Sequence, residues 1–593
     1  MNNKRILVTT AIEDTWGFDK YKEIIFLGEW CKVYSSKSLW QELNHRVVNF
    51  FWEDRTKFKK DYNYIEELYE NLLSSLTDTL NSYHNTTHSV GYWRIVLGPW
   101  LLTYVSAIWS RWEGLRVAFN NNKFDETILL DFSAEYTPPS SHLESMSLIS
   151  SSHSWNHLVF ARILKKYYAD KINFIYLPYC EKSFSQEISD YNRKYSLKYK
   201  IYSWFDKLAG LIRCDEKVVF VTSYFSAVSL AKIALKLRQL PRFYQEFDQA
   251  IEMPNASSSS RSKLILSLNC SGEFETFVKD NLFLDIPIPY LEGYSIILKK
   301  SKHLLPNCEV VFSANSYWYN DLFKIWCAEK FNLKKIIIIS EHGSSIRPKY
   351  KNFSHEEKIS DIYTVWHKSL SNRQVRLPPN KIVGTNPIGK YGTNLLVVGL
   401  ESSLYPARCC SGPVSSLLLN DYFQNMEFIN GIDPVIHKYL KVHPHHNSGW
   451  STSQRYIDEL SASNISPHST LLKAFKYSRI IVCTYPETTF FEAMYSGVPT
   501  ILLYKKEYWE FCSEFDGLVE VLEDANILFD NPLLASNHIN KIWNNPKTWW
   551  DSKKVINARE EFFDQCGRVD DDWLEQWVNF FKAQLTNLEK IND

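Results

Sequence analysis

Short apolar runs alternate with stretches of helical periodicity along most of the chain. Runs of strand length occur at residues 6–9, 24–27, 128–130, 172–177, 218–222, 264–268, 310–313 and 335–340, and a second series at 395–400, 439–443, 480–484 and 500–504. Strands that alternate with helices predict parallel sheets covered by helices. The pattern therefore predicts an α/β fold with two Rossmann-like domains that face a central cleft.

The boundary between these domains is predicted from composition. Residues 373–390 are rich in Pro, Gly and Asn, which favours a linker. Residues 1–375 would then form the first Rossmann-like domain, with helical insertions at 62–83 and 91–120, and residues 376–545 the second. Residues 546–593 are helical and rich in tryptophan. We expect these helices to cross back to the first domain.

Composition limits the classes of partner. With 593 residues the chain is too long for a single core. Lys+Arg and Asp+Glu are equal at 67 each, so no bulk charge attracts nucleic acid or an anionic membrane. The 11 cysteines are odd in number and contain no Cys-x-x-Cys pair, which favours a reducing compartment and argues against a structural zinc.

No targeting or membrane-spanning segment is predicted. The N-terminus enters a strand at once and lacks the apolar region of a signal peptide. Charges at Arg94, Arg111, Glu113 and Arg116 interrupt the most apolar stretch, so no window reaches about 18 uncharged apolar residues. We expect a cytoplasmic protein, and peripheral association with the inner face of a membrane stays open.

The segment 479–503 has the pattern of strand, turn, helix, glycine stop and second strand. Thr488 and Thr489 come at the predicted start of the helix, where hydroxyls, unpaired backbone N–H groups and the helix dipole favour a phosphate. Glu492 follows one turn later, where a carboxylate can accept hydrogen bonds from ribose hydroxyls. An ordinary β-α-β crossover in which the threonines only cap the helix is the alternative.

Residues 441–450 (KVHPHHNSGW) follow another predicted strand of the same sheet. The carboxyl ends of parallel strands share one edge, so His443 should face the same crevice as Thr488. His443, helped by Lys441, could contact a phosphate or the leaving nucleotide. Structural and metal-binding interpretations remain, although no nearby Cys or carboxylate completes a tetrahedral metal site. We therefore expect no metal and no cofactor beyond the donor substrate.

The apolar strand at 336–339 ends in the turn Ser340-Glu341-His342-Gly343. A continuous apolar run is typical of a strand buried on both faces, and the residues beyond it reach the crevice. His342 is placed for acid–base work, and Gly343 permits close approach of a ligand. A loop histidine followed by a helix cap is the alternative.

Several motifs resemble those of a transferase family encoded in bacterial surface-polysaccharide gene clusters. They are residues 9–16 (TTAIEDTW), 26–31 (FLGEWC), 92–95 with 98–100, the His-Gly turn at 342–343, 355–356 with 360–363, and the block 488–500. The resemblance covers essentially the whole chain. The chain departs from the family pattern at Glu341–Ser344 and at Val365–His367.

The order Glu-Ala-Met-x-x-Gly-x-Pro at 492–499 resembles the signature of GT-B glycosyltransferases, and the His-Gly, His-Pro and Thr-Thr elements are similar to those of CMP-sugar-dependent Kdo transferases and sialyltransferases. The resemblance implies that His443, Thr488 and Thr489 hold the phosphate of a CMP-linked nonulosonate, with Glu492 as a further donor contact. A retaining enzyme would also need a carboxylate nucleophile. The candidates are Asp321, Glu341, Glu309 and Asp131.

These features together predict a metal-independent glycosyltransferase that builds a bacterial surface polysaccharide such as lipopolysaccharide. The partners would be a nucleotide-sugar donor and a glycan or glycolipid acceptor, with no nucleic acid. Glu13, Asp14, Glu29 and the tryptophans 16 and 30 suit an acceptor sugar, although both tryptophans could equally be core. A UDP-sugar-dependent GT-B enzyme or epimerase and a non-catalytic glycan-binding scaffold are the alternatives.

Overall fold

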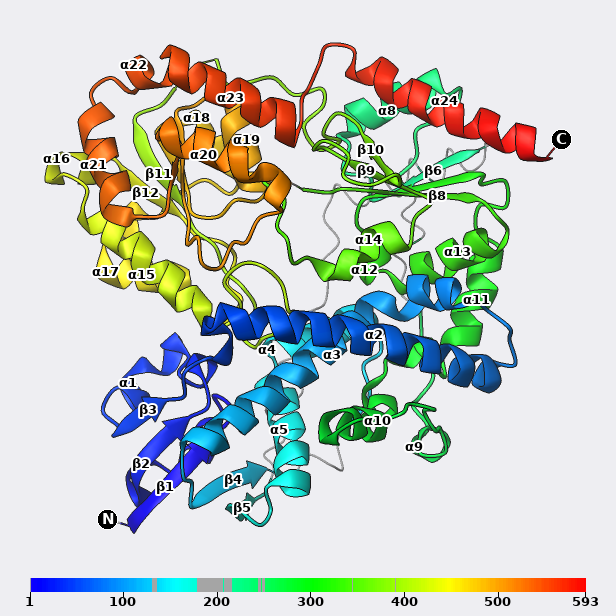
Figure 1. The fold of residues 1–593 in the computed structure, drawn as a ribbon, viewed down its shortest axis with the longest axis vertical. Coiled ribbons are helices and arrows are strands. Elements are labelled where there is room, and N and C mark those ends of the chain that lie inside the picture. Colours follow the sequence, from blue (N-terminus) through cyan, green and yellow to red (C-terminus); the bar gives the residue numbers. More distant parts are fainter. Residues whose placement is uncertain are drawn as a thin grey trace.

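The computed structural model describes residues 2–130, 136–178, 206, 216–243, 247, 251–343, 345–389 and 391–592. Its described strands form three separate five-stranded sheets (Figure 1). The first sheet contains β1 (Asn2–Val8), β2 (Tyr21–Phe26), β3 (His45–Val47), β4 (Glu126–Leu130) and β5 (Asn173–Leu177). Their order is β3-β2-β1-β4-β5, and neighbours pair in parallel.

The second sheet contains β6 (Val218–Val221), β7 (Val310–Ser313), β8 (Ile336–Ser340), β9 (Ile362–Val365) and β10 (Gln374–Arg376). Its order, β10-β9-β8-β7-β6, simply follows the chain, and all its pairs are parallel. The central strands are buried along their length, as the continuous apolar run at 336–339 predicts.

The third sheet contains β11 (Asn394–Val398), β12 (Leu440–His443), β13 (Ser478–Cys483), β14 (Thr500–Leu503) and β15 (Leu528–Phe529). Its order is β12-β11-β13-β14-β15, and every pair is parallel. From β11 the chain first adds β12 on one side and then adds β13, β14 and β15 on the other side. The strand order therefore reverses between β11 and β13. In an open parallel sheet, the carboxyl ends of the two strands at such a reversal border a crevice that binds ligands.

The predicted fold class, α/β with parallel sheets, is confirmed. The arrangement differs from the expectation in one respect: residues 1–375 hold two sheets rather than the single sheet of one Rossmann-like domain. The run at 264–268 is also not a strand. Leu266 and Leu268 are buried there while Ile265 is exposed, so the alternation reflects packing of an irregular segment that pairs with no strand.

Two long helices separate the first sheet from the second (Figure 1). α2 (Arg55–His84) begins after Asp54, whose carboxylate accepts from the backbone N–H groups of Thr56 and Lys57. α3 (Val90–Asn121) is buried over most of its surface. Its Gly98 is required by packing, because a Cβ there would lie 2.7 Å from the ring of His355. These helices correspond to the two long helical insertions predicted from the sequence.

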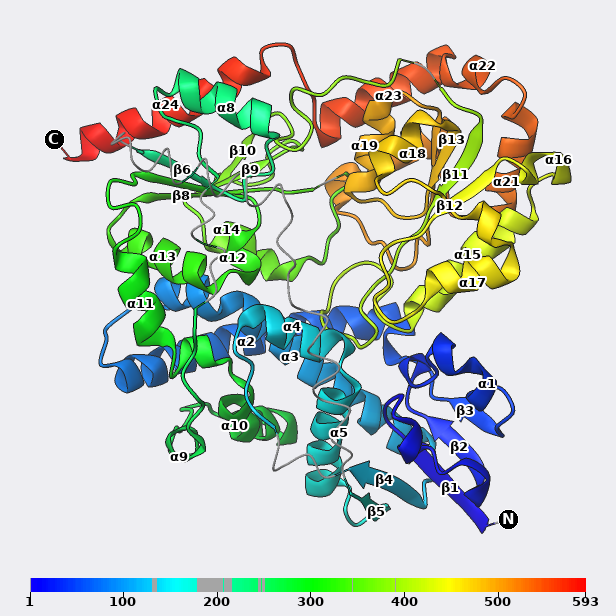
Figure 2. The ribbon, with the colours of Figure 1, turned by 180° about the vertical axis from the view of Figure 1, so that it is seen from behind.

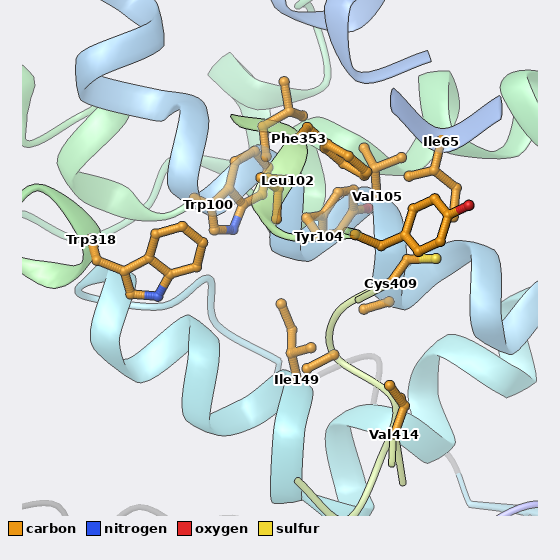
Figure 3. Packing of buried hydrophobic residues seen from close by; sticks show 14 of the residues in the cluster. Ile65, Trp100, Leu102, Tyr104, Val105, Ile149, Trp318, Phe353, Cys409 and Val414 are labelled. Carbon is orange, nitrogen blue, oxygen red and sulfur yellow. The ribbon is translucent and has the colours of Figure 1, made fainter. Parts of the chain in front are cut away.

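The loop after β11 is built into this helical layer. Figure 3 shows Cys409 and Val414 packed among side chains of α3 and of α4 (His142–Ser151). The buried Arg111 guanidinium donates to the carbonyls of Pro406 and Ile149. The Tyr405 N–H donates to the carbonyl of Ser150 at 3.0 Å. A loop of the third sheet is therefore held by helices that precede it in the chain by about 250 to 300 residues.

The C-terminal helices bridge the third and second sheets. α23 (Lys553–Cys566) contacts α20 (Asp516–Asp524), and α24 (Trp573–Asn592) lies beside α8 (Ala227–Lys236), as both views show (Figures 1 and 2). The indole N–H of Trp577 donates to the carbonyl of Pro378, and Phe581 packs against Phe220 and Phe312 of the second sheet. None of the described helices combines the length and apolarity needed to cross a membrane.

Candidate functional site

The His342–Gly343 turn after β8 touches the start of α19 (Thr488–Ser496). A Cβ placed on Gly343 would lie 1.9 Å from the hydroxyl oxygen of Thr488. The carboxyl ends of the second and third sheets therefore meet at this point. The structure brings together His342 and Thr488, which the sequence predicted to lie on opposite walls of one crevice.

His342 is held as a neutral imidazole. Burial, together with the positive charges of Lys351 and Arg408, lowers its pKa to about 4, although the carboxylates of Glu356 and Glu341 oppose the shift. Its ring lies 5.8 Å from that of Tyr224, which follows β6 in the strained left-handed conformation with φ of 63°. A neutral imidazole can donate one hydrogen bond and accept another.

The contact at Gly343 gives a first prediction. Gly343→Ala should lower kcat/KM, because the new methyl group must push the His342 turn and α19 apart at a cost of about 1–3 kcal/mol, the usual scale of overpacking. Steady-state kinetics with a fixed nucleotide donor measure the change.

The matched background is Thr488→Ala, which removes the hydroxyl that lies 1.9 Å from the new methyl and leaves a 3.2 Å contact with its Cβ that a small shift can relieve. In a double-mutant cycle the loss caused by Gly343→Ala should shrink in this background, with a coupling of about 0.5–3 kcal/mol. Equal losses in both backgrounds would show that the two segments do not meet in the working enzyme.

His443 ends β12 and Lys441 lies two residues before it. Burial lowers the pKa of His443, helped by His468 and His445, and its Nδ1 has no hydrogen-bond partner among the described residues. The Lys441 ammonium instead donates to the carbonyl of Ser463, beside the edge strand. Two residues along a strand span about 6.6 Å, so Lys441 is set back from the carboxyl edge at which we expected it to act.

Thr489 and Glu492 also have partners within the protein. The Thr489 hydroxyl and the Tyr485 hydroxyl lie 2.7 Å apart, and Thr489 is 7% exposed. Glu492 forms an ion pair of 2.7 Å with Lys381, which belongs to the segment that joins the second and third sheets. Thr488 is the more accessible of the two predicted hydroxyls.

The candidate nucleophiles are occupied by structural donors. The backbone N–H of Trp366 donates to Oε2 of Glu341 at 3.0 Å, and Glu341 is 3% exposed beside a small cavity of about 120 Å³. Asp321 accepts from the Tyr290 hydroxyl and the His142 backbone N–H, and pairs with Lys324 at 2.9 Å.

The two remaining candidate nucleophiles are Glu309 and Asp131. Glu309 pairs with Lys335 just before β7 and β8 begin, at the opposite edge of the sheet. Asp131 lies outside the described residues. Sequence reasoning named Asp321, Glu341 and Glu309 as candidates but could not foresee the donors that surround them.

A cavity of about 870 Å³ lies at the carboxyl edge of the third sheet. Loops after β11, β12 and β13 form one wall, and α3, α4 and the segment around Val33 and Ser35 form the other. Nine serines line it, and it contains the reversal point between β11 and β13. Neither His443 nor Thr488 is among its lining residues. In the chain, Thr488 directly follows the lining residue Glu487, and His443 comes three residues before the lining residue His446.

Glu487 is the cavity residue that the sequence reasoning missed. It immediately precedes α19, and its side chain is exposed to the cavity. Loss of bulk water raises the pKa of its carboxyl, opposed by positive charge on Lys351, Arg408 and His445. The signal was present in the sequence, because Glu487 occupies the same strand-end turn as Thr488.

Arg408 carries no pattern that would have identified it. Its guanidinium lies over the ring of Trp318, 4.6 Å from the centroid, and it lines the same cavity. Within the described ranges no carboxylate lies at ion-pair distance from it. Arg408 is placed by the loop that Arg111 anchors.

Other expectations concern tryptophans and metal. Trp16 and Trp30 are fully or almost fully buried, and their indole N–H groups donate to the carbonyls of Thr10 and Thr9, so the structure gives both a core role. In the part of the chain that the structure describes, no group of three or more His, Cys, Asp or Glu side chains is arranged to hold a metal ion.

A family model described as "LIC12162 family transferase" matches residues 5–581. No curated protein is significantly similar in sequence. Among solved structures, the chain is similar to S. aureus MnaA in a UDP co-structure (13% identity; 62% of this chain and 97% of that chain; TM-score 0.34). It is also similar to the spinosyn rhamnosyltransferase SpnG complexed with spinosyn aglycone (10%; 62% and 99%; 0.29) and to the glycosyltransferase SsfS6 of Streptomyces sp. SF2575 (10%; 62% and 99%; 0.30).

Proposed function

We propose that this chain, which belongs to the LIC12162 family of transferases, moves a sugar from a nucleotide-sugar donor to a bacterial surface glycan. The observation that carries the proposal is the cavity of about 870 Å³ at the reversal point of the third sheet. Its volume is in the range of small-molecule sites, and its position is the one at which open parallel sheets bind nucleotides.

Unsatisfied polar groups in the cavity support a ligand. Ser402 and Trp509 line the cavity, and among the described residues the buried Ser402 hydroxyl and Trp509 indole N–H have no hydrogen-bond partner. Buried polar groups are almost always paired in folded proteins, so such groups are expected to bind substrate or water.

The donor phosphate would lie at the start of α19. Thr488 offers a hydroxyl, the first backbone N–H groups of the helix are unpaired within it, and the dipole favours an anion. His443 ends the edge strand β12, which β11 separates from β13, and its buried Nδ1 has no partner among the described residues. We expect its imidazole to contact the same phosphate. These groups serve one phosphate, which favours a CMP-linked donor over UDP- or GDP-sugars.

The donor sugar would carry a carboxylate. Arg408 is a cavity cation without an ion-pair partner in the described ranges, and a guanidinium matches the geometry of a carboxylate. A nonulosonate such as Kdo has this group. In a UDP- or GDP-sugar, Arg408 would meet the second phosphate instead, so nucleotide preference separates the two possibilities.

In the reaction, an acceptor hydroxyl oxygen forms a bond to the anomeric carbon of the donor. The bond from that carbon to the phosphate oxygen breaks, and its electron pair leaves with the nucleotide. We assign the departing hydroxyl proton to the Glu487 carboxylate, whose raised pKa makes it a stronger base than an ordinary carboxylate. His443 and the helix start stabilise the leaving phosphate, so the reaction should need no metal.

The test is calorimetric titration with CMP, UDP and GDP in the presence of EDTA. CMP should bind most tightly, and His443→Ala should weaken its binding by about 1–3 kcal/mol, the scale of a hydrogen bond to a charged group. His303→Ala, an exposed histidine on the second-sheet side, is the matched control and should leave binding unchanged.

Each other outcome has a definite meaning. Saturable binding of UDP or GDP without CMP would overturn the CMP-linked donor and leave a nucleotide-sugar enzyme. Binding that requires a divalent ion would overturn metal independence. Binding of no nucleotide at all would reject the transferase mechanism proposed here and favour a glycan-binding scaffold.

A further inference from the structure

A second cavity, of about 470 Å³, lies at the carboxyl ends of β2 and β3 in the first sheet. Its floor is formed by the segments that follow these strands, around Glu29, Lys32 and Val47–Phe50. Its other wall is α15 (Leu417–Asn430) of the third-sheet region, together with Arg455. The cavity therefore exists only where the first and third sheets are assembled.

The lining has the chemistry of a saccharide site. Trp40 and Phe423 present aromatic faces, and Phe423 is 58% exposed although it is a large apolar side chain. Asn49 and Asn420 add amides. Sugars combine apolar C–H faces with hydroxyls, so aromatic platforms beside amides and charged groups suit them.

Two charged groups in the cavity lack a partner of opposite charge. Arg455 donates through Nε to the carbonyl of Trp450 and stacks over Tyr34, but no carboxylate of the described residues is at ion-pair distance. Glu53 likewise has no cation at that distance in the described ranges, and desolvation raises the pKa of its carboxyl. Lys32, by contrast, pairs with Glu29 at 3.2 Å. A guanidinium and a carboxylate that face one cavity without pairing can bind the hydroxyls of a neutral sugar from both sides.

The second cavity adjoins the first. Val33, Ser35 and Val414 line the large cavity, while Glu29, Lys32 and Ser416 line the smaller one. Two short segments, residues 29–35 and 414–416, therefore separate the two cavities, and each segment contributes lining residues to both. The backbone N–H of Glu29 donates to the Ser416 hydroxyl at 3.3 Å, and this contact joins the two segments.

We infer that the two cavities bind one extended acceptor, an oligosaccharide whose reacting end lies in the large cavity and whose preceding sugars occupy the small one. This inference rests on the proposed function, because it takes the large cavity as the site of transfer. It adds the substrate class: a glycan chain of several sugars rather than a monosaccharide or an apolar aglycone.

The experiment uses the full chain on an array of defined bacterial surface oligosaccharides of four or more sugars, printed beside their own terminal mono- and disaccharides. The oligosaccharides should be retained at least about tenfold more tightly than their short forms. Phe423→Ser should lower the affinity for the long forms about tenfold and leave the affinity for the short forms unchanged. Glu53→Gln should act in the same direction. Tyr176→Ser, a comparably exposed aromatic on β5, is the control and should change nothing.

Equal retention of long and short forms, no retention of any oligosaccharide, or retention that Phe423→Ser and Glu53→Gln leave unchanged would overturn the inference. Nucleotide titration of the same variants keeps the two proposals apart. Loss of chain-length preference with intact CMP binding rejects only the extended acceptor site. Glycan retention without nucleotide binding rejects the transferase mechanism and leaves the glycan site standing.

Discussion

Glu487→Gln is expected to lower the turnover of sugar transfer by about 10²–10⁴-fold, the usual contribution of a positioned general base. The substitution keeps the shape and hydrogen-bonding size of the side chain but removes its ability to take the proton of the acceptor hydroxyl. Because Glu487 is the N-cap residue of α19, where the donor phosphate is proposed to lie, removing its negative charge should strengthen nucleotide binding rather than weaken it.

The pH profile distinguishes a base from a structural carboxylate. In the wild type, turnover should fall as the pH drops through the raised pKa of Glu487, because the protonated carboxyl cannot accept a proton. The Gln variant should lack this acidic limb. Glu514→Gln, an exposed glutamate of the same region, should retain both turnover and profile. Full turnover in Glu487→Gln would exclude the carboxylate as the base.

Acidification is expected to unfold the protein between about pH 6.5 and 4.5, well before ordinary carboxylates are protonated. His157 and His355 are buried, and burial lowers the pKa of each to about 3. The backbone N–H of Leu130 donates to Nε2 of His157, a bond that requires the neutral ring. Both nitrogens of His355 lack partners within the described residues, and Gly98 packs against its ring.

The direction follows from the depressed pKa values. Above the ordinary histidine pKa of 6.5, these two histidines are neutral in both the folded and the unfolded chain, and their full contribution to stability is present. As the pH falls below 6.5, only the unfolded chain binds the two protons. This continues until the folded pKa near 3 is reached. Each histidine then lowers the free energy of unfolding by about 1.4 kcal/mol per pH unit, and the two together lower it by about 3 kcal/mol per unit. Against a typical net stability of about 5–15 kcal/mol this is a large loss.

Urea unfolding at stepped pH measures this slope. His355→Leu should reduce it by about 1.4 kcal/mol per pH unit, because an apolar side chain cannot take up the proton. The exposed His303→Ala should leave it unchanged. A free energy of unfolding that stays flat from pH 6.5 to 4.5 would contradict the assignment of neutral buried histidines.

Periodicity identified most strands and the fold class, because burial on two faces leaves a local record of apolar residues, as at 336–339 and 480–482. It could not identify which strands share a sheet. β5 and β6 are consecutive among the described strands, yet β5 pairs with β4 and β6 with β7. Pairing is decided by long-range packing around α2 and α3, which leaves no local pattern.

The site was predictable where it depends on the carboxyl-edge rule and not where it depends on loops. The meeting of His342 and Thr488 follows from two strand ends in facing sheets. Arg408 does not, since its position depends on the remote Arg111. Lys441, Glu341 and Asp321 have charges suited to chemistry, but their engagement by Ser463, Trp366 and Tyr290 is visible only in three dimensions.

Because Arg111 and Ser150 anchor the loop after β11, the third sheet is not expected to be structurally independent of the helical layer. A fragment limited to the third sheet would keep the β13–α19 turn, but the wall that carries Ser402 and Arg408 would lose the helices that shape it. We therefore expect that the third-sheet region cannot be exchanged between proteins as an independent module. Insertions or deletions in α3 and α4 would change the shape of the large cavity, so these helices and the β11 loop should have evolved as one unit.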